Sequence, residues 1–202
     1  MASKTQIARL SLLRIGVTIV VNNVETDRGK EANAINLMFD DERDFVLRAF
    51  PWPFTTTYAT LGLVGGSSSA RVSNDWHYSY RYPSDCMFAR RLVTGLGRRD
   101  PAPPPFIIGR DTQGKLIYTN EPDAELEYTG AVTEPEDFDA LCVSALAWKI
   151  AAACAPSMSR IKGMFEQCME GYHVELSMAQ AVALNEQQQE EERESDMISS
   201  RA

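Results

Sequence analysis

The residues that come nearest to a catalytic motif in this chain are 109–115, with the sequence GRDTQGK. They match the start of a P-loop, in which backbone N–H groups hold nucleotide phosphates and a Ser or Thr after the lysine binds magnesium. Here that position is Leu116, and a strand-like pattern follows it, whereas a P-loop requires a helix N-terminus. We therefore interpret 111–114 as the turn of a β-hairpin between strands at 106–108 and 116–119.

A second group of reactive side chains comprises His77, Ser84, Asp85 and Cys86, which lie close together in sequence. Nucleophilic catalysis needs a base within hydrogen-bond reach of the nucleophile and a further group that orients the base. The spacing gives no indication of that arrangement. We interpret His77 as a surface residue and expect no catalytic residue in this group.

The cysteines are scattered along the chain and lack the Cys-x-x-Cys spacing that is typical of zinc sites. Most of them lie among apolar residues of helical pattern, where a free cysteine behaves as a small hydrophobic residue. We expect no metal, no cofactor and no disulfide framework. The residues concerned are Cys86, Cys142, Cys154 and Cys168.

One carboxylate, Glu42, falls inside an otherwise apolar helical face. Burying a carboxylate is costly unless it is paired, so we expect Glu42 to contact Arg14 or Arg48, or to lie at a subunit boundary. Glycoside hydrolysis needs two carboxylates on either side of a cleft. A hydrolase that uses Glu42 or Asp85 as its acid is one alternative. A structural role for Glu42 is favoured, because ion-pair networks also place carboxylates in such positions.

The elements that must position these residues are helices at both ends of the chain and strands in the middle. This pattern predicts a mainly α protein of the α+β type. We expect a bundle of about four helices, a small antiparallel β region and a long protruding C-terminal helix or tail. The predicted helices are 3–16, 26–50, 140–155 and one from 157 or 159 to 194; the predicted strands, besides the hairpin, are 55–64, 78–82, 86–93 and 126–132.

Four regions follow from this pattern. Residues 1–54 form the N-terminal helices of the bundle, and 55–132 form a β-rich insertion with long loops. Residues 133–186 form the C-terminal helices, and 187–202 form an acidic C-terminal tail.

Capping residues indicate where two of the helices begin. Ser3 and Gln6 have capping-box spacing, as do Thr133 and Glu136, with Pro135 in the first turn. The last helix carries one apolar stripe at intervals of three and four residues, which ends where the Gln- and Glu-rich tail begins. That stripe consists of Ile161, Phe165, Cys168, Tyr172, Leu176, Ala179 and Ala183.

The net charge of −8 and the isoelectric point near 4.9 argue against sequence-independent binding of nucleic acid, which depends on basic residues. This charge is compatible with a surface along which DNA slides without binding. The sequence has no apolar run of about 18 residues, which a membrane-spanning helix would need. Its N-terminus also lacks the pattern of a signal peptide. We therefore expect no membrane association and a place in the cytoplasm of the cell that makes the protein.

Long loops and the polar tail are the candidate interaction surfaces, because long loops in a small domain often carry binding. Two apolar residues in the tail are the expected anchors for a partner. The loop candidates are Trp76, Pro103, Pro104 and Pro105, and the tail candidates are Gln189, Glu192, Arg193, Met197 and Ile198.

Several short segments, in order along nearly the whole chain, resemble the head-to-tail adaptor family of short-tailed bacteriophages, related to tail tubular protein A. The segment with the sequence LRAFPWPF is the most telling of them. The segments are 6–10, 13–16, 47–54 (LRAFPWPF), 82–86, 126–130, Pro135, Phe138 and 145–149.

The resemblance implies a structural role without catalytic residues. Members form a ring, here expected to hold about twelve copies, between the portal and the tail nozzle of the virion. The expected partners are the portal protein at the tail candidates and the nozzle or a neighbouring subunit at the loop candidates. Viral double-stranded DNA would pass through the channel without sequence-specific binding. The protein would be found in the host cytoplasm during assembly and at the head–tail junction afterwards.

Two other functions remain as alternatives. One is a virion-associated peptidoglycan hydrolase that uses Glu42 or Asp85. The other is a host-directed interaction protein that acts through the proline-rich loop at 101–105 or through the acidic C-terminal helix.

Overall fold

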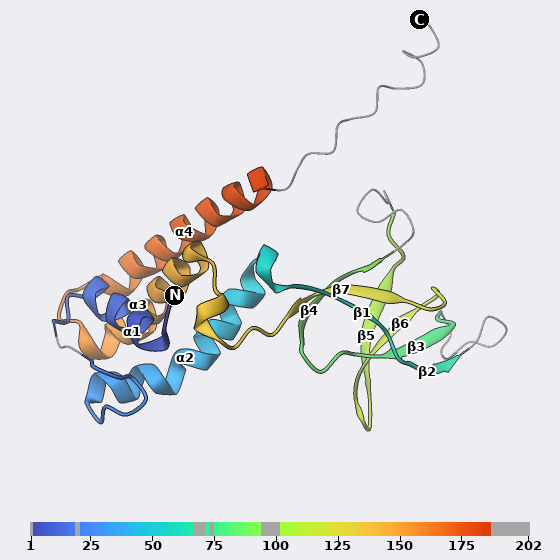
Figure 1. The fold of residues 1–202 in the computed structure, drawn as a ribbon, viewed down its shortest axis with the longest axis horizontal. Coiled ribbons are helices and arrows are strands. Elements are labelled where there is room, and N and C mark those ends of the chain that lie inside the picture. Colours follow the sequence, from blue (N-terminus) through green and yellow to red (C-terminus); the bar gives the residue numbers. More distant parts are fainter. Residues whose placement is uncertain (1, 19–20, 67–71, 73–74, 94–101, 187–202) are drawn as a thin grey trace, which may run out of the picture.

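The computed structural model describes residues 2–18, 21–66, 72, 75–93 and 102–186. Helices form one lobe and strands form the other, and the chain passes from the first lobe to the second and back again (Figure 1). Each lobe has a hydrophobic core of its own.

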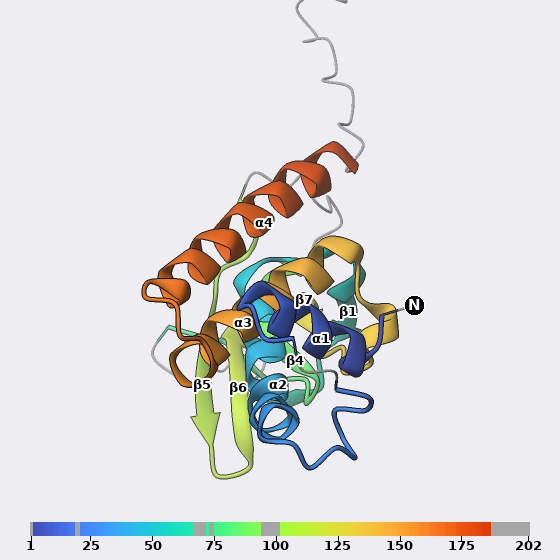
Figure 2. The same ribbon diagram turned by 90° about the vertical axis from the view of Figure 1, so that its left-hand side faces the viewer.

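The helical lobe is built around α3, which packs against each of the other three helices. Helix α4 lies along one side of the lobe and α2 along the opposite side, with α1 and α3 between them (Figures 1 and 2). Among the described residues, α3 alone is long and apolar enough to span a membrane, with a mean hydropathy of 1.4, although Ser144 and Lys149 interrupt its apolar residues. Its position as the central core helix accounts for that composition. The helices are α1 (Lys4–Arg14), α2 (Lys30–Ala49), α3 (Ala140–Met158) and α4 (Met164–Glu186).

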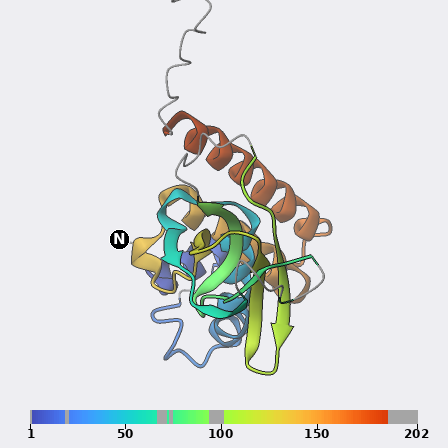
Figure 3. The ribbon, with the colours of Figure 1, turned by 90° about the vertical axis from the view of Figure 1, so that its right-hand side faces the viewer.

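The β lobe, which faces the viewer in Figure 3, contains two antiparallel sheets. The first sheet, sheet A, has the strand order β1-β7-β4, and the second, sheet B, has the order β2-β3-β6-β5. Leu92, Ile117 and Leu126 are fully buried in the core of this lobe. The strands are β1 (Thr56–Thr60), β2 (Leu63–Gly66), β3 (Tyr78–Arg81), β4 (Cys86–Val93), β5 (Phe106–Asp111), β6 (Gly114–Thr119) and β7 (Glu125–Gly130), with short 3-10 helices η1 (Pro53–Thr55) and η3 (Pro135–Asp137) beside them.

The prediction of a mainly α fold with a small β region is wrong. Among the described residues, seven strands form two antiparallel sheets beside four α-helices, which is an α+β fold. The predicted strand 55–64 is in fact two strands that belong to different sheets. The chain crosses between the sheets at Leu61 and Gly62, where the Leu61 N–H donates to the Ala124 carbonyl at 2.9 Å. The predicted protrusion beyond α4 lies outside the described residues.

The predicted helix starts had different outcomes. The α1 start is confirmed, because the Ser3 hydroxyl accepts a hydrogen bond from the Gln6 N–H at 3.1 Å. The capping box at Thr133 and Glu136 is wrong. A 3-10 turn occupies that stretch, and α3 begins after Asp139, whose carboxylate accepts from the Leu141 N–H at 3.0 Å.

The boundary between the last two helices also differs from the prediction. Helix α3 continues through Pro156 to Met158, and α4 begins only after Gly163, which has a positive φ of 77°. The stripe of buried residues on this helix therefore starts at a different residue from the one predicted. Met164 is buried, whereas Ile161 lies before the helix and Phe165 is 46% exposed. The rest of the stripe is oriented as predicted: Cys168, Tyr172, Leu176 and Ala179 pack in or against the core, and Ala183 is buried.

Candidate functional site

The P-loop-like segment is a β-hairpin, as predicted. Strands β5 and β6 pair in register up to Asp111 opposite Gly114. The Asp111 carboxylate accepts the Gln113 N–H at 2.8 Å and two bonds from the Arg81 guanidinium at 3.0 Å. These contacts lower the pKa of Asp111, chiefly through the hydrogen bonds from Arg81. The carboxylate fastens the hairpin to β3, so the segment has a structural role.

Glu42 is paired, although not with the partners expected from sequence. Its Oε2 lies 3.4 Å from Lys149 Nζ, which links α2 to α3. The same ammonium group is 4.4 Å from the centre of the Phe45 ring. The expected partner Arg48 instead lies over the Phe88 ring. The ion pair with Lys149 makes Glu42 part of the packing between two helices.

The other expected partner, Arg14, links three helices of the bundle. Its guanidinium donates to the Ser144 carbonyl at 2.7 Å and to the Ser144 hydroxyl at 2.8 Å, and it lies 4.2 Å from the Trp148 ring centre. The Ser144 hydroxyl donates in turn to Glu175 at 2.9 Å. Ser144, one of the few polar residues in the apolar helix α3, thereby has hydrogen-bond partners on both α1 and α4.

Asp85 belongs to the β lobe and has a partner of its own. The Tyr128 hydroxyl donates to its two carboxylate oxygens, at 3.1 and 3.0 Å. Glu42 and Asp85 are thus engaged in separate interactions in two lobes. Glycoside hydrolysis uses two carboxylates on either side of one cleft, whereas these two carboxylates are each held by a partner within its own lobe.

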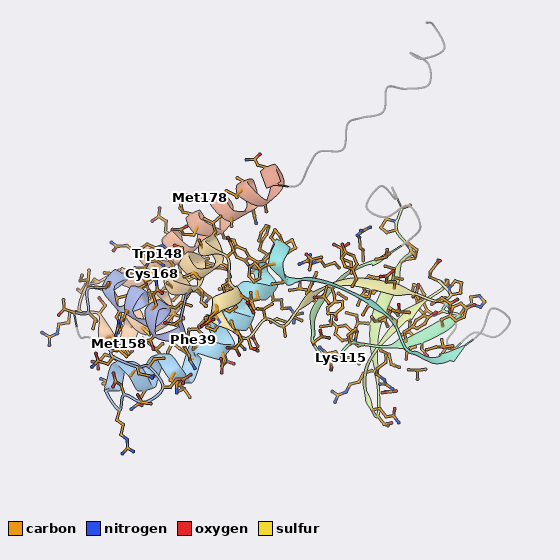
Figure 4. The ribbon with its side chains drawn as sticks, viewed as in Figure 1. Phe39, Lys115, Trp148, Met158, Cys168 and Met178 are labelled. Atoms are coloured by element: carbon orange, nitrogen blue, oxygen red, sulfur yellow. The ribbon has the colours of Figure 1, made fainter. Side chains whose placement is uncertain are left out.

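Ser84 and Cys86 line a surface pocket of about 610 Å³ together with Tyr82 and Lys115. Figure 4 places Lys115 on the β lobe, and its Nζ lies 5.2 Å from the Tyr82 ring centre. Burial raises the pKa of both the Cys86 thiol and the Tyr82 hydroxyl. Neither group ionises readily at neutral pH, which is unfavourable for a nucleophile.

His77 is half-buried, so it is not the open surface residue that we expected. Its backbone N–H donates to the Asn120 side chain at 2.9 Å. Within the part of the chain that the structure describes, its Nδ1 is buried and has no hydrogen-bond partner. Over the same residues, no three His, Cys, Asp or Glu side chains come together as metal ligands.

We expect the protein to lose stability in alkali partly through Tyr128. Burial and the bond to Asp85 raise the pKa of Tyr128 to about 12, above the value near 10 of an unfolded tyrosine. A raised folded-state pKa stabilises the fold fully below about pH 10, and that contribution is lost as the pH rises through about 12. Urea unfolding across this range should show the decline, and it should be shallower in Tyr128→Phe. An equally steep decline in that variant would contradict the assignment.

The predicted loop candidates lie in the β lobe. Pro103 and Pro105 are exposed, whereas Pro104 and Trp76 are half-buried. The Pro105 carbonyl accepts from the Thr119 hydroxyl at 3.1 Å, which ties the end of the proline-rich segment to β6. The five tail candidates, Gln189, Glu192, Arg193, Met197 and Ile198, lie outside the described residues.

A surface that the sequence reading missed is the outer side of α4. Val174 is 54% exposed, Met178 is 51% exposed and Val182 is 41% exposed. Figure 4 shows Met178 on this helix. These residues recur every four positions, and this spacing indicates a second apolar face on the helix.

A second missed surface comprises the two edges of sheet B, which expose Leu63 on β2 and Ile107 and Ile108 on β5. Strong β-propensity marks Ile107 and Ile108 as strand residues, but it does not say that their strand lies at an edge.

The clearest candidate functional features of the described residues are therefore two exposed apolar surfaces, the outer side of α4 and the edges of sheet B. The four cysteine thiols are buried, whereas Ser84 is exposed. The carboxylates of Glu42, Asp85 and Asp111 are engaged by neighbouring side chains. No protein-family model matches this chain, and no curated protein is significantly similar to it.

Proposed function

We propose that this protein is a structural head-to-tail adaptor of a short-tailed bacteriophage. It would form a ring between the portal and the tail nozzle and line the DNA exit channel. The observation that carries the proposal is the exposure of apolar side chains on two separate surfaces, one in each lobe. These are the outer side of α4 and the edges of sheet B.

Scattered exposed apolar residues are normal on any protein, but contiguous apolar surfaces often mark interaction sites. A ring subunit needs such surfaces, because it contacts neighbours on either side as well as partners above and below. The net charge of −8 supports the same role. An acidic subunit would repel the phosphates of DNA that passes through the ring, within a screening length of about 10 Å at ordinary salt.

Sedimentation of the full chain, alone and with the portal protein of the same phage, tests the proposal. We expect the isolated chain to be monomeric or weakly associated, and we expect a ring that co-sediments with the portal. If the chain never co-sediments with the portal, the adaptor assignment is wrong.

A chain truncated after Glu186 is the matched variant in this experiment. It keeps every described helix and strand, so we expect its circular dichroism and thermal midpoint to match those of the full chain. We expect it to lose portal attachment, because it lacks Met197 and Ile198. Unchanged attachment would show that 187–202 is not the portal contact.

A further inference from the structure

One row of side chains runs across all four strands of sheet B. Leu63 on β2 is opposite Tyr80 on β3, Tyr80 is opposite Ile117 on β6, and Ile117 is opposite Ile108 on β5. Residues that are directly opposite in an antiparallel sheet point to the same face. The row therefore forms a continuous apolar strip from one edge of the sheet to the other.

Burial changes sharply along this strip. Tyr80 and Ile117 in the middle are 2% and 0% exposed, whereas Leu63 and Ile108 at the ends are 57% and 53% exposed. Natural sheets usually protect an edge with a charged residue, a proline or a covering segment. Strand β2 has no charged residue, and in β5 the charged residues come only at the end, after Gly109. Each edge therefore carries apolar side chains over its first half, Leu63 and Val64 on β2 and Phe106–Ile108 on β5.

The directions of the strands make the two edges compatible with each other. Each neighbouring pair in the order β2-β3-β6-β5 is antiparallel, so β2 and β5 run in opposite directions. When two copies stand side by side in the same orientation, the β5 edge of one meets the β2 edge of the next as an antiparallel pair. In the described residues, neither edge has another strand beside it.

We propose that the occupant of each edge is a second copy of this chain, and that β5 of one subunit pairs with β2 of the next. Ile108 of one copy and Leu63 of its neighbour would then continue the same apolar strip across the boundary. The contact uses two different surfaces, so it is head-to-tail and closes into a ring when the rotation between copies allows. This inference rests on the proposed adaptor function and identifies the contact between its subunits.

Cysteine cross-linking in the full chain tests the pairing. The double variant Leu63→Cys/Ile108→Cys is treated with a short bis-maleimide in the folded state, alone over a concentration series and bound to the portal. The native Cys86, Cys142, Cys154 and Cys168 are buried and should react slowly. We expect a ladder of covalent oligomers on a denaturing gel.

The two single variants are the matched controls. A head-to-tail contact brings position 63 next to position 108 of the neighbour, so neither single variant should cross-link by itself. An equal mixture of the two should give dimers and nothing larger. Cross-linking within a single variant would show a symmetric contact and would overturn the pairing of β5 with β2.

A charge at the edge provides a second measurement. Ile108→Asp should weaken association by about tenfold or more, because an unpaired carboxylate is costly at an apolar contact. Leu37→Asp, on α2 and outside both apolar surfaces, should leave association between copies unchanged. The opposite ranking would assign the subunit contact to α2 and overturn the proposal. Both side chains are more than half exposed, so the fold should tolerate either change.

The outcomes separate this inference from the proposed function. Rings on the portal without 63–108 cross-links would overturn the strand pairing and leave the adaptor role intact. A 63–108 ladder without portal binding would support the pairing and refute the adaptor role. Absence of association under every condition would refute both.

Discussion

Replacing Trp52 with alanine is expected to destabilise the protein by about 3–5 kcal/mol, the usual cost of removing a buried Trp side chain. Trp52 is 1% exposed in the core of the helical lobe. Its ring meets the Phe50 ring edge-on, with 5.0 Å between the centroids, and lies 6.2 Å from that of Phe54. Its indole N–H donates to the Val46 carbonyl in the last turn of α2 at 3.0 Å. Chemical denaturation followed by circular dichroism measures the loss.

Two further variants show which part of Trp52 matters. Trp52→Phe keeps most of the apolar surface and removes the hydrogen bond, so we expect a smaller loss than for alanine. Tyr58→Ala is the matched control, because Tyr58 is a half-exposed aromatic residue on β1 and should change stability by about 0.5 kcal/mol or less. If Trp52→Ala were as mild as Tyr58→Ala, the segment around Trp52 would not be part of the core.

Residues 50–54 belong to the segment that contributes most to the resemblance to phage adaptors. Their packing explains why this segment alternates aromatic residues with prolines. Phe50, Trp52 and Phe54 pack against the bundle core. With Pro53 they also line a pocket of about 160 Å³ that faces the last turns of α4, at Ala179 and Ala183. The segment therefore connects the end of α2, the start of the β lobe and the end of α4.

Local signals in the sequence predicted local structure well. The Ser3 cap, the turn after Asp111 and the strand at 86–93 were all identified, because each depends on neighbouring residues. The end of the second helix was also close, since Pro51 cannot donate to the helical ladder. The prediction of a capping box at Thr133 was wrong, because the N-cap of α3 is Asp139, a few residues later.

Contacts between distant parts of the chain were not predictable in the same way. Glu42 was expected beside an arginine, but its partner Lys149 is more than a hundred residues away and faces it only once α2 packs on α3. The split of 55–64 between two sheets depends likewise on Ala124, which holds Leu61 from another part of the fold. Leu63 and Ile108 are the exposed ends of the apolar strip across sheet B. Their position at the sheet edges could not be predicted, because it depends on the order of the strands in the sheet.

The packing of α4 on α3 gives the second prediction with a large expected effect. A Cβ added at Gly171 would lie 2.8 Å from atoms of the Trp148 ring. We expect Gly171→Leu to destabilise the protein by about 2–3 kcal/mol, because a well-packed interface has no room for the added side chain. In Gly171→Ala the same overlap is opposed by the better helix propensity of alanine, worth about 1 kcal/mol, so its loss should be smaller.

A control on the same helix separates this clash from the general effect of a larger residue. Ala181 is exposed on α4, so Ala181→Leu should leave the free energy of unfolding nearly unchanged. Trp148→Ala should destabilise by itself, because it removes a half-buried ring that also contacts Arg14. Combined with Gly171→Leu it should cost less than the sum of the two, because the space left by the indole receives the leucine. Additive losses would mean that Gly171 and Trp148 do not touch, and α4 would then have to meet α3 along a different line.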